Sequence, residues 1–220
     1  DYEYLIIDEY QDISIDRYQF TRNISLLSNA KVTSVGDDWQ TIFSFAGSRI
    51  DLFLKYNRLF PGAKQLFINN TYRNSQELID RAGMFIMRNP LQIKKSLLSN
   101  VTRTNPLKFY HYDKNQYDIV RNILKKIHNN NPNDNVLILA RKNKHISKMF
   151  ETDYFTEGVD SRVVFKDYPN MIIDAMSIHS AKGLGADQVI LLNVTNDDFP
   201  CPNKEDIWLN NLFKPQGYNE

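Results

Sequence analysis

Two adjacent carboxylates follow the first apolar segment of the chain. The run Tyr-Leu-Ile-Ile at 4–7 leads directly into Asp8 and Glu9, with Gln11 and Asp12 close behind. A strand that ends in two carboxylates can hold a hydrated Mg²⁺ with the first and polarise a water with the second, as nucleotide hydrolysis requires. A solvated loop explains the bare pair equally well, and Gln11 and Asp12 make the pattern more specific.

A second polar cluster follows the next β-branched segment. Gly-Asp-Asp-Trp-Gln occupies 36–40, and Phe43 and Phe45 come at alternate positions after it. The amide of Gln40 can donate to a phosphate or orient a water. The two phenylalanines can stack on unpaired bases, because every base has a π-face. Two phenylalanines at this spacing are, however, more often buried in a hydrophobic core.

A third group of residues is basic. Arg141, Lys142, Lys144 and Lys148 lie within eight residues, where they can contact phosphates of a nucleic acid. The alternative is a solvated start of a helix.

Strands that alternate with helices must position these groups. Apolar, β-branched runs predict strands at 4–7, 32–35, 65–68, 107–110, 136–139, 162–165, 171–178 and 189–194. Helical patterns cover 15–27, 75–87, 116–127 and 143–150. This order predicts an α/β fold with parallel sheets, whose ligands bind at the carboxyl ends of the strands.

Composition narrows the classes of protein. Of 220 residues 42% are hydrophobic, which excludes simple disorder, and 27 Lys+Arg against 26 Asp+Glu leave a net charge of +1. Nucleic-acid binding must therefore depend on local patches. The single cysteine, Cys201, fits a reducing compartment, so we expect a cytoplasmic protein without a membrane span. The first residue is Asp1, already at the edge of a strand, so we expect a piece of a longer protein.

Four motifs together resemble a known family. The segments 5–12 and 36–40 resemble the Walker B and coupling motifs of superfamily 1 DNA helicases of the UvrD/Rep/PcrA type, closest to the DNA helicase IV branch. Asn-Thr-Tyr-Arg-Asn-Ser at 70–75 is similar to the family's Tyr-Arg element. Ser-Ile-His-Ser-Ala-Lys-Gly-Leu at 177–184 is similar to its Thr-His-x-x-Lys-Gly element. The resemblance implies RecA-like P-loop NTPase lobes.

The resemblance implies a role in ATP hydrolysis for several residues. Asp8 would coordinate Mg²⁺, and Glu9 would be the general base for the attacking water. Gln40 would sense the γ-phosphate, and Arg73 would reach it as an arginine finger, for which a permanently charged planar fork is suited. The expected ATP-binding residues are Gln40, Tyr72 beside the adenine, Arg73 and Gly183.

The resemblance also implies a DNA surface. Phe43 and Phe45 would stack on bases, and His179 and Lys182 would contact the strand. Arg141 and Asn143 belong to a segment similar to the family's strand-Arg-x-Asn element. The implied partner is single-stranded DNA or a junction of single and double strands, with 3′ to 5′ polarity.

Other family elements are absent from these 220 residues. The sequence contains no Gly-x-x-x-x-Gly-Lys-Ser/Thr loop and no late arginine motif. We therefore expect residues 1–66 to complete a first lobe and 67–220 to form most of a second, inactive without the missing parts. The span from Tyr72 to His179 leaves no room for a large accessory insertion. Gly185 replaces the acidic residue that often binds ribose.

Two alternatives to a helicase of DNA repair stay open at this point. A degenerate, non-catalytic module could bind nucleic acid or a partner through the same scaffold, and the motor could serve a phage or an anti-phage defence system. A phosphate-binding loop upstream of Asp1 would favour the enzyme over the non-catalytic module. Protein partners are unknown.

Overall fold

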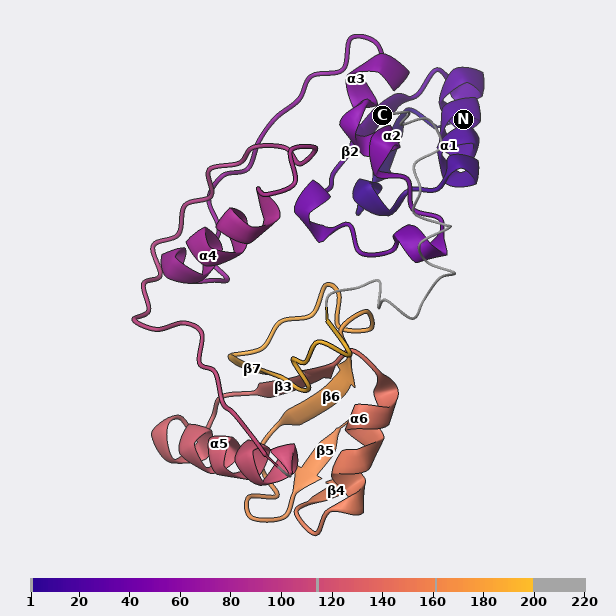
Figure 1. Ribbon diagram of the computed structural model, residues 1–220. Helices are drawn as coiled ribbons and strands as arrows, with labels where there is room; N and C mark the ends of the chain where they lie inside the picture. Colours follow the sequence, from indigo (N-terminus) through magenta and orange to yellow (C-terminus); the bar gives the residue numbers. More distant parts are fainter. Residues whose placement is uncertain (1, 114, 161, 200–220) are drawn as a thin grey trace. The chain divides into compact units, whose positions relative to one another are not determined.

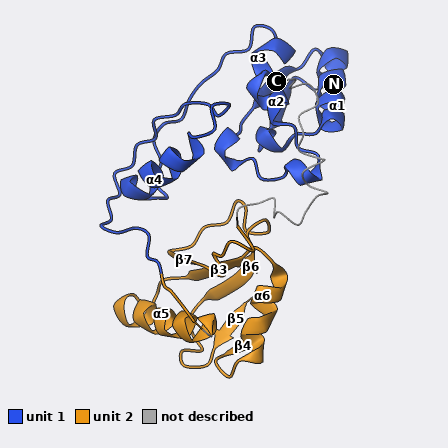
Figure 2. Ribbon diagram, in the orientation of Figure 1, with its two compact units in different colours: residues 1–109 blue, residues 110–220 orange. Residues whose placement is uncertain are grey.

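The computed structural model describes residues 2–113, 115–160 and 162–199. The chain divides into two compact units, Asp1–Phe109 and Tyr110–Glu220 (Figures 1 and 2). Cys201 lies outside the described residues. Each unit carries its own parallel sheet, so the α/β class with parallel sheets is confirmed.

The first unit contains one short sheet and a series of helices. Its elements are β1 (Tyr4–Ile7), the 3-10 turn η1 (Tyr10–Asp12), α1 (Ile15–Ser28), β2 (Lys31–Ser34), the 3-10 turns η2 (Asp38–Gln40) and η3 (Ser44–Ala46), α2 (Ile50–Leu54), α3 (Tyr56–Leu59) and α4 (Gln76–Ile86).

Helix α1 connects the two parallel strands of this unit. Ser14 caps its first turn by accepting from the Arg17 amide at 3.3 Å, and Asn29 ends it in the left-handed conformation. The chain then returns as β2, with Tyr4 opposite Lys31 and Ile7 opposite Ser34. The carboxyl ends of both strands therefore meet at one edge of the sheet.

Aromatic side chains make the core beneath that edge. Tyr10, Ile13 and Tyr18 are buried, and Tyr10 meets the Tyr56 ring edge-on with centroids 5.2 Å apart. Because Tyr10 directly follows the carboxylate pair, this packing anchors the loop that carries Asp8 and Glu9.

The second unit is built around a three-stranded parallel sheet. Its elements are α5 (Gln116–Asn130), β3 (Val136–Ala140), α6 (Asn143–Ser147), the 3-10 turn η4 (Lys148–Glu151), β4 (Phe155–Glu157), β5 (Val163–Phe165), β6 (Ile173–Ser177) and β7 (Gln188–Leu191). The strand order is β6-β3-β7, so β3 is central, while β4 and β5 pair antiparallel as a separate two-stranded sheet.

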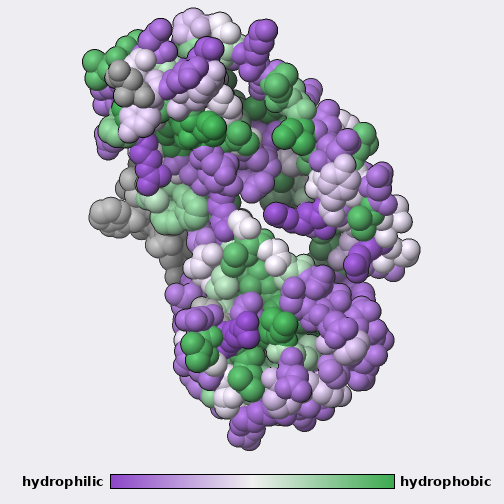
Figure 3. Space-filling view, turned by 180° about the vertical axis from the view of Figure 1, so that it is seen from behind, coloured by the Kyte–Doolittle hydropathy of each residue, from purple (hydrophilic) through white to green (hydrophobic). Residues whose placement is uncertain are grey.

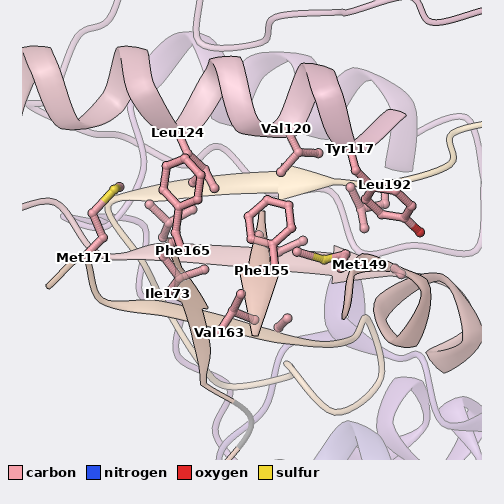
Figure 4. Close-up of a cluster of buried hydrophobic side chains, with 14 residues drawn as sticks. Tyr117, Val120, Leu124, Met149, Phe155, Val163, Phe165, Met171, Ile173 and Leu192 are labelled. Atoms are coloured by element: carbon pink, nitrogen blue, oxygen red, sulfur yellow. The ribbon is translucent and has the colours of Figure 1, made fainter. Parts of the chain in front are cut away.

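The core of the second unit lies between α5 and the strands. Figure 4 shows Tyr117, Val120 and Leu124 of α5 projecting toward Phe155, Phe165 and Ile173. Leu124 and Ile138 are fully buried, and the Phe155 and Phe165 rings stack with centroids 5.5 Å apart. This core holds the central strand and hence the polar residues that follow it.

Two predicted strands are wrong. Residues 65–68 and 107–110 form no strand, and Leu66 and Ile68 are 90% and 83% exposed. An apolar run forms a strand only where another strand accepts its backbone hydrogen bonds, and among the described residues none pairs with these two. The structure adds β4, α2 and α3, which the sequence did not predict.

The compact units do not divide at the predicted lobe boundary. Residues 67–109 cluster with the first unit, because Trp39 and Asp38 bond to the backbone of Ile93. The assignment of 1–66 and 67–220 to two lobes therefore stays a prediction, distinct from this division.

Hydrophobic side chains also reach the surface of both units, as the green areas of Figure 3 show. Leu27, Leu66 and Val159 are among the most exposed of them. Within the described part of the chain, no helix combines the length and apolar character needed to cross a bilayer.

Candidate nucleotide and nucleic-acid sites

The edge where β1 and β2 end carries the first candidate site. The Val35 amide donates to the Ile7 carbonyl and the Tyr10 amide to the Val35 carbonyl, both at 2.8 Å, so the strands stay paired up to the carboxylates. Glu9 has a left-handed backbone, φ 52° and ψ 40°, and its amide donates to Asp8 Oδ1 at 2.8 Å. The turn thus presents both acidic side chains at the carboxyl end of the sheet.

Gln11 joins this turn to the second motif. Its side chain is buried; Nε2 donates to Glu9 Oε2, and Oε1 accepts from the Asp37 amide at 2.9 Å. Gly36 makes the approach possible, because a Cβ there would lie 2.6 Å from Gln11 Oε1 and 2.7 Å from Phe53 Cε2. One buried amide therefore bridges the predicted Walker B and coupling motifs.

Asp37 extends the connection to Gln40. Gln40 Nε2 donates to Asp37 Oδ2 at 2.8 Å, and the Trp39 amide donates to Asp37 Oδ1 at 3.1 Å. Burial opposes ionisation of Asp37, but hydrogen bonds from Lys95 and Gln40 and the charge of Lys95 outweigh it and lower its pKa. Glu9, Gln11, Asp37 and Gln40 thus form a continuous hydrogen-bonded series, with Asp37 ionised.

Phe43 and Phe45 lie together just after this series. Their rings meet edge-on with centroids 6.0 Å apart, and the turn closes through Gly47, whose φ is 90°. Phe45 is 52% exposed and Phe43 is partly buried. The predicted stacking surface is therefore more open at Phe45 than at Phe43.

Tyr72 and Arg73 belong to the same unit but are not joined to these residues. Both side chains are exposed, in the turn before α4. Among the described residues, no hydrogen bond or ion pair links either of them to Asp8, Glu9 or Gln40. Their roles at the nucleotide stay predictions.

In the second unit, Arg141 and His179 come together at the ends of β3 and β6. Arg141 Nη1 lies 3.1 Å from His179 Nε2 and 3.3 Å from Nδ1. Burial, and then the positive charge of Arg141, lower the pKa of His179, so the imidazole is neutral at pH 7. The parallel register of the two strands makes them neighbours.

A buried carboxylate fixes the basic segment. Asp198 Oδ1 lies 2.9 Å from Lys142 Nζ, and Oδ2 lies 3.6 Å from Nε2 of the buried His145. Burial opposes ionisation of Asp198, but Lys142 and His145 lower its pKa. Burial lowers the pKa of His145, against the attraction of Asp198. Lys142 is thus partly engaged within the fold.

The remaining predicted residues surround these pairs. Asn143 is the first residue of α6 and is exposed, and Lys182 is partly buried in the turn after β6. Gly183 follows in the left-handed region at φ 84°, which a glycine adopts without strain.

Asp8 is the carboxylate predicted to hold Mg²⁺. Among the described residues, no group of three or more His, Cys, Asp or Glu side chains could hold a metal ion. Mg²⁺ in nucleotide sites is commonly held by one or two carboxylates together with phosphate oxygens and water. Asp8, directly after β1, can supply one such carboxylate.

The sequence did not identify three residues that organise these sites. Gln11 appeared only as support for a motif, Asp198 had no pattern around it, and Lys95 lies in a segment without a motif. Each acts through a contact distant in sequence, such as Gln11 with Asp37, and residue types alone do not reveal such contacts.

Comparison with known proteins agrees with these motifs. Residues 1–61 match the UvrD/REP helicase N-terminal domain. The chain is 29% identical to DNA helicase IV of Escherichia coli over 97% of its own length, which is 30% of that protein. It is 30% identical to ATP-dependent DNA helicase Rep of Buchnera aphidicola (Schizaphis graminum) over 76% of the chain and 24% of Rep.

Escherichia coli Rep is 34% identical over 44% of the chain and 14% of its own length. The chain therefore spans about a third or less of these relatives. The chain is thus similar to DNA helicases of the UvrD/Rep type, and the match to the UvrD/REP helicase N-terminal domain is confined to residues 1–61.

Proposed function

We propose that the chain is part of an ATP-dependent DNA helicase or translocase that couples ATP hydrolysis to movement on single-stranded DNA. Residues 1–66 would complete a first RecA-like lobe and 67–220 form most of a second. The relatives are named DNA helicases, which supports this class of activity. The low cysteine content fits a reducing compartment, and we propose the cytoplasm.

The hydrogen-bonded series from Glu9 to Gln40 is the observation that carries the proposal. Glu9 would accept a proton from the attacking water, and Gln40 would contact the γ-phosphate. Asp37 bonds to Gln40 through its carboxylate and to Gln11 through its backbone amide, and Gln11 bonds to Glu9, so nucleotide contact at Gln40 would reach the Glu9 carboxylate through this series. An ordinary solvated loop has no need of a buried amide at Gln11.

Asp8 would hold the Mg²⁺ that accompanies ATP. The metal supplies positive charge against the phosphates and the charge that develops on them. Asp8 also accepts from the Glu9 amide, so it positions the turn that bears the general base. Arg73, Tyr72 and Gly183 would complete the nucleotide site as finger, adenine contact and backbone contact.

DNA would bind to residues of both units. Phe45, supported by Phe43, offers a stacking surface in the first unit. In the second unit, Arg141 would contribute a permanent positive charge and His179 a neutral ring. Asn143 follows Arg141 by two residues, and Lys182 follows His179 by three. These contacts act on backbone and base faces, which fits binding of a single strand or a junction without sequence preference.

Replacing the general base tests the catalytic part of the proposal. In the full-length protein that contains this chain, Glu9→Gln should lower the kcat of DNA-stimulated ATP hydrolysis by about 100-fold or more and leave ATP binding intact. Glu3→Gln, the same change at the opposite end of β1, should have no effect. Full ATPase activity in Glu9→Gln would refute the assignment.

The same measurements distinguish the alternative functions. A wild-type protein that binds single-stranded DNA but hydrolyses no ATP would be a non-catalytic binding module. A DNA-stimulated ATPase would be the proposed motor, whether it serves repair, a phage or a defence system.

A further inference from the structure

Lys95 lies far from the motifs in sequence but touches both carboxylates of the second one. Its Nζ forms ion pairs with Asp37 Oδ1 and Asp38 Oδ1, and its side chain is only 13% exposed. The side chain of Asp38 is completely buried. A buried carboxylate requires a counterion, and Lys95 supplies it for Asp38 while it also bonds to Asp37.

Two hydrogen bonds to the backbone of Ile93 hold the segment that carries Lys95 against the coupling motif. The Ile93 amide donates to Asp38 Oδ2 at 2.7 Å, and Trp39 Nε1 donates to the Ile93 carbonyl at 3.2 Å. The Lys95 ammonium also lies 5.3 Å from the centroid of a Trp39 ring. The segment 93–95 and the turn 37–40 are therefore linked by several polar contacts.

Lys95 determines which atoms of Asp37 remain for its other partners. Lys95 and the Trp39 amide occupy Oδ1, so Oδ2 is directed to Gln40 Nε2. The Asp37 amide on the same residue donates to Gln11, which holds Glu9. Asp37 thus connects Lys95 to Gln40 through its carboxylate and to Gln11 and Glu9 through its backbone amide.

We propose that Lys95 is a positioning residue for ATP hydrolysis, which fixes Asp37 and through it Gln40 and Glu9. This inference rests on the proposed function. It makes the segment 93–95 a part of the coupling machinery, although that segment carries no recognisable motif. Lys95 itself contacts neither nucleotide nor water in this role.

A double-mutant cycle in the full-length protein tests the proposal. Lys95→Met is combined with Asp38→Asn, so that no uncompensated charge stays buried, and Lys94→Met serves as the matched control because Lys94 is the exposed neighbour. The paired change should lower kcat about 10- to 100-fold with little change in KM, as expected for misplaced catalytic groups. Adding Gln40→Ala should cause no further loss beyond that of Gln40→Ala alone.

Hydrogen exchange measured by mass spectrometry provides a readout that does not depend on activity. The amides of Trp39 and Gln40 donate to Asp37 within this turn, and the Asp37 amide donates to the side chain of Gln11. The Lys95 variants should exchange faster over 37–40 and unchanged over β3, whereas Lys94→Met should match wild type at both. Unchanged exchange at 37–40, or losses that multiply with Gln40→Ala, would overturn the proposal.

Failure of the two proposals gives different results. A wild-type protein without ATPase activity would refute the proposed function and this inference with it. An active wild type whose kcat is insensitive to the Lys95 and Asp38 changes would refute only the positioning role of Lys95.

Discussion

Arg141 and His179 are neighbours across two parallel strands, with Arg141 Nη1 3.1 Å from His179 Nε2. Both lie just beyond the carboxyl end of a strand: Arg141 directly follows β3, and His179 is the second residue after β6. The sheet register therefore joins a permanently charged side chain to a neutral one from a distant motif.

The first prediction concerns the protonation of His179. Arg141→Gln removes a positive charge that disfavours the imidazolium, so the pKa of His179 should rise toward its usual value, as an NMR titration of the histidine ring protons would show. Because the folded-state pKa is lowered, the stability from neutral His179 is present above about pH 6.5 and lost as the pH falls through the folded pKa. Arg162→Gln, at an exposed site, should leave the pKa unchanged; a pKa of His179 unaffected by Arg141→Gln would contradict the geometry.

The second prediction concerns the charge of Arg141 on DNA. If Arg141 contacts a phosphate, Arg141→Gln should reduce the slope of log K against log salt by about 0.7 for single-stranded DNA. Fluorescence titrations of a labelled oligonucleotide at several salt concentrations would measure this. An unchanged slope would exclude the phosphate contact.

The third prediction concerns stacking on Phe45, which should contribute to affinity without affecting its salt dependence. Phe45→Ala should weaken binding of single-stranded DNA about 5- to 150-fold, which corresponds to about 1–3 kcal/mol for one stacked base, with no change in the salt slope. Phe20→Ala on α1 is the control, because Phe20 is exposed but belongs to no candidate site. Equal effects of the two changes would count against stacking.

The close approach at Gly36 gives a fourth prediction. Gly36→Ala should lower the free energy of unfolding by about 1–3 kcal/mol and reduce ATPase activity, because the added Cβ displaces Gln11 or Phe53. At Gly83, inside α4, an added Cβ would lie 3.3 Å from Trp39 Cη2. Because alanine also has the higher helix propensity, Gly83→Ala should change the free energy of unfolding by less than about 1 kcal/mol. Denaturant unfolding of both variants is the measurement; a Gly36→Ala protein as stable as wild type would mean that the loop adapts freely.

The fifth prediction tests the core of the second unit. Leu124→Ala should reduce the free energy of unfolding by about 3 kcal/mol, since Leu124 is fully buried between α5 and the sheet. Val159→Ala, at a side chain 79% exposed, should cost less than about 0.5 kcal/mol. Similar losses in both variants would disprove the packing shown in Figure 4.

Elements with a continuous apolar run and a partner strand were predictable from sequence. The prediction for β1 matches the structure at both ends, 4–7, and β3 differs by one residue. The runs at 65–68 and 107–110 were equally apolar but lack a partner among the described strands, which no local pattern reveals. Of the short antiparallel pair, β5 was predicted and β4 was not, because the three residues of β4 give too little periodicity to detect.

The candidate site shows the same limit. The motifs named Asp8, Glu9 and Gln40, but the residues that connect them, Gln11 and Asp37, are identified only by the contact between their two loops. Lys95 was not predictable at all, since a lysine in a polar segment is ordinarily solvated, and only tertiary structure reveals that its ammonium is enclosed by two carboxylates.

The backbone of Glu9 has a consequence for how this protein can be engineered. A glutamate in the left-handed region is strained by about 1 kcal/mol or more relative to glycine, which adopts φ 52° without a steric cost. Selection for the stability of this loop alone would therefore favour glycine or asparagine at position 9. The most stable version of the turn would be one that has lost its proposed general base, so thermostability and hydrolysis are expected to conflict at this single residue.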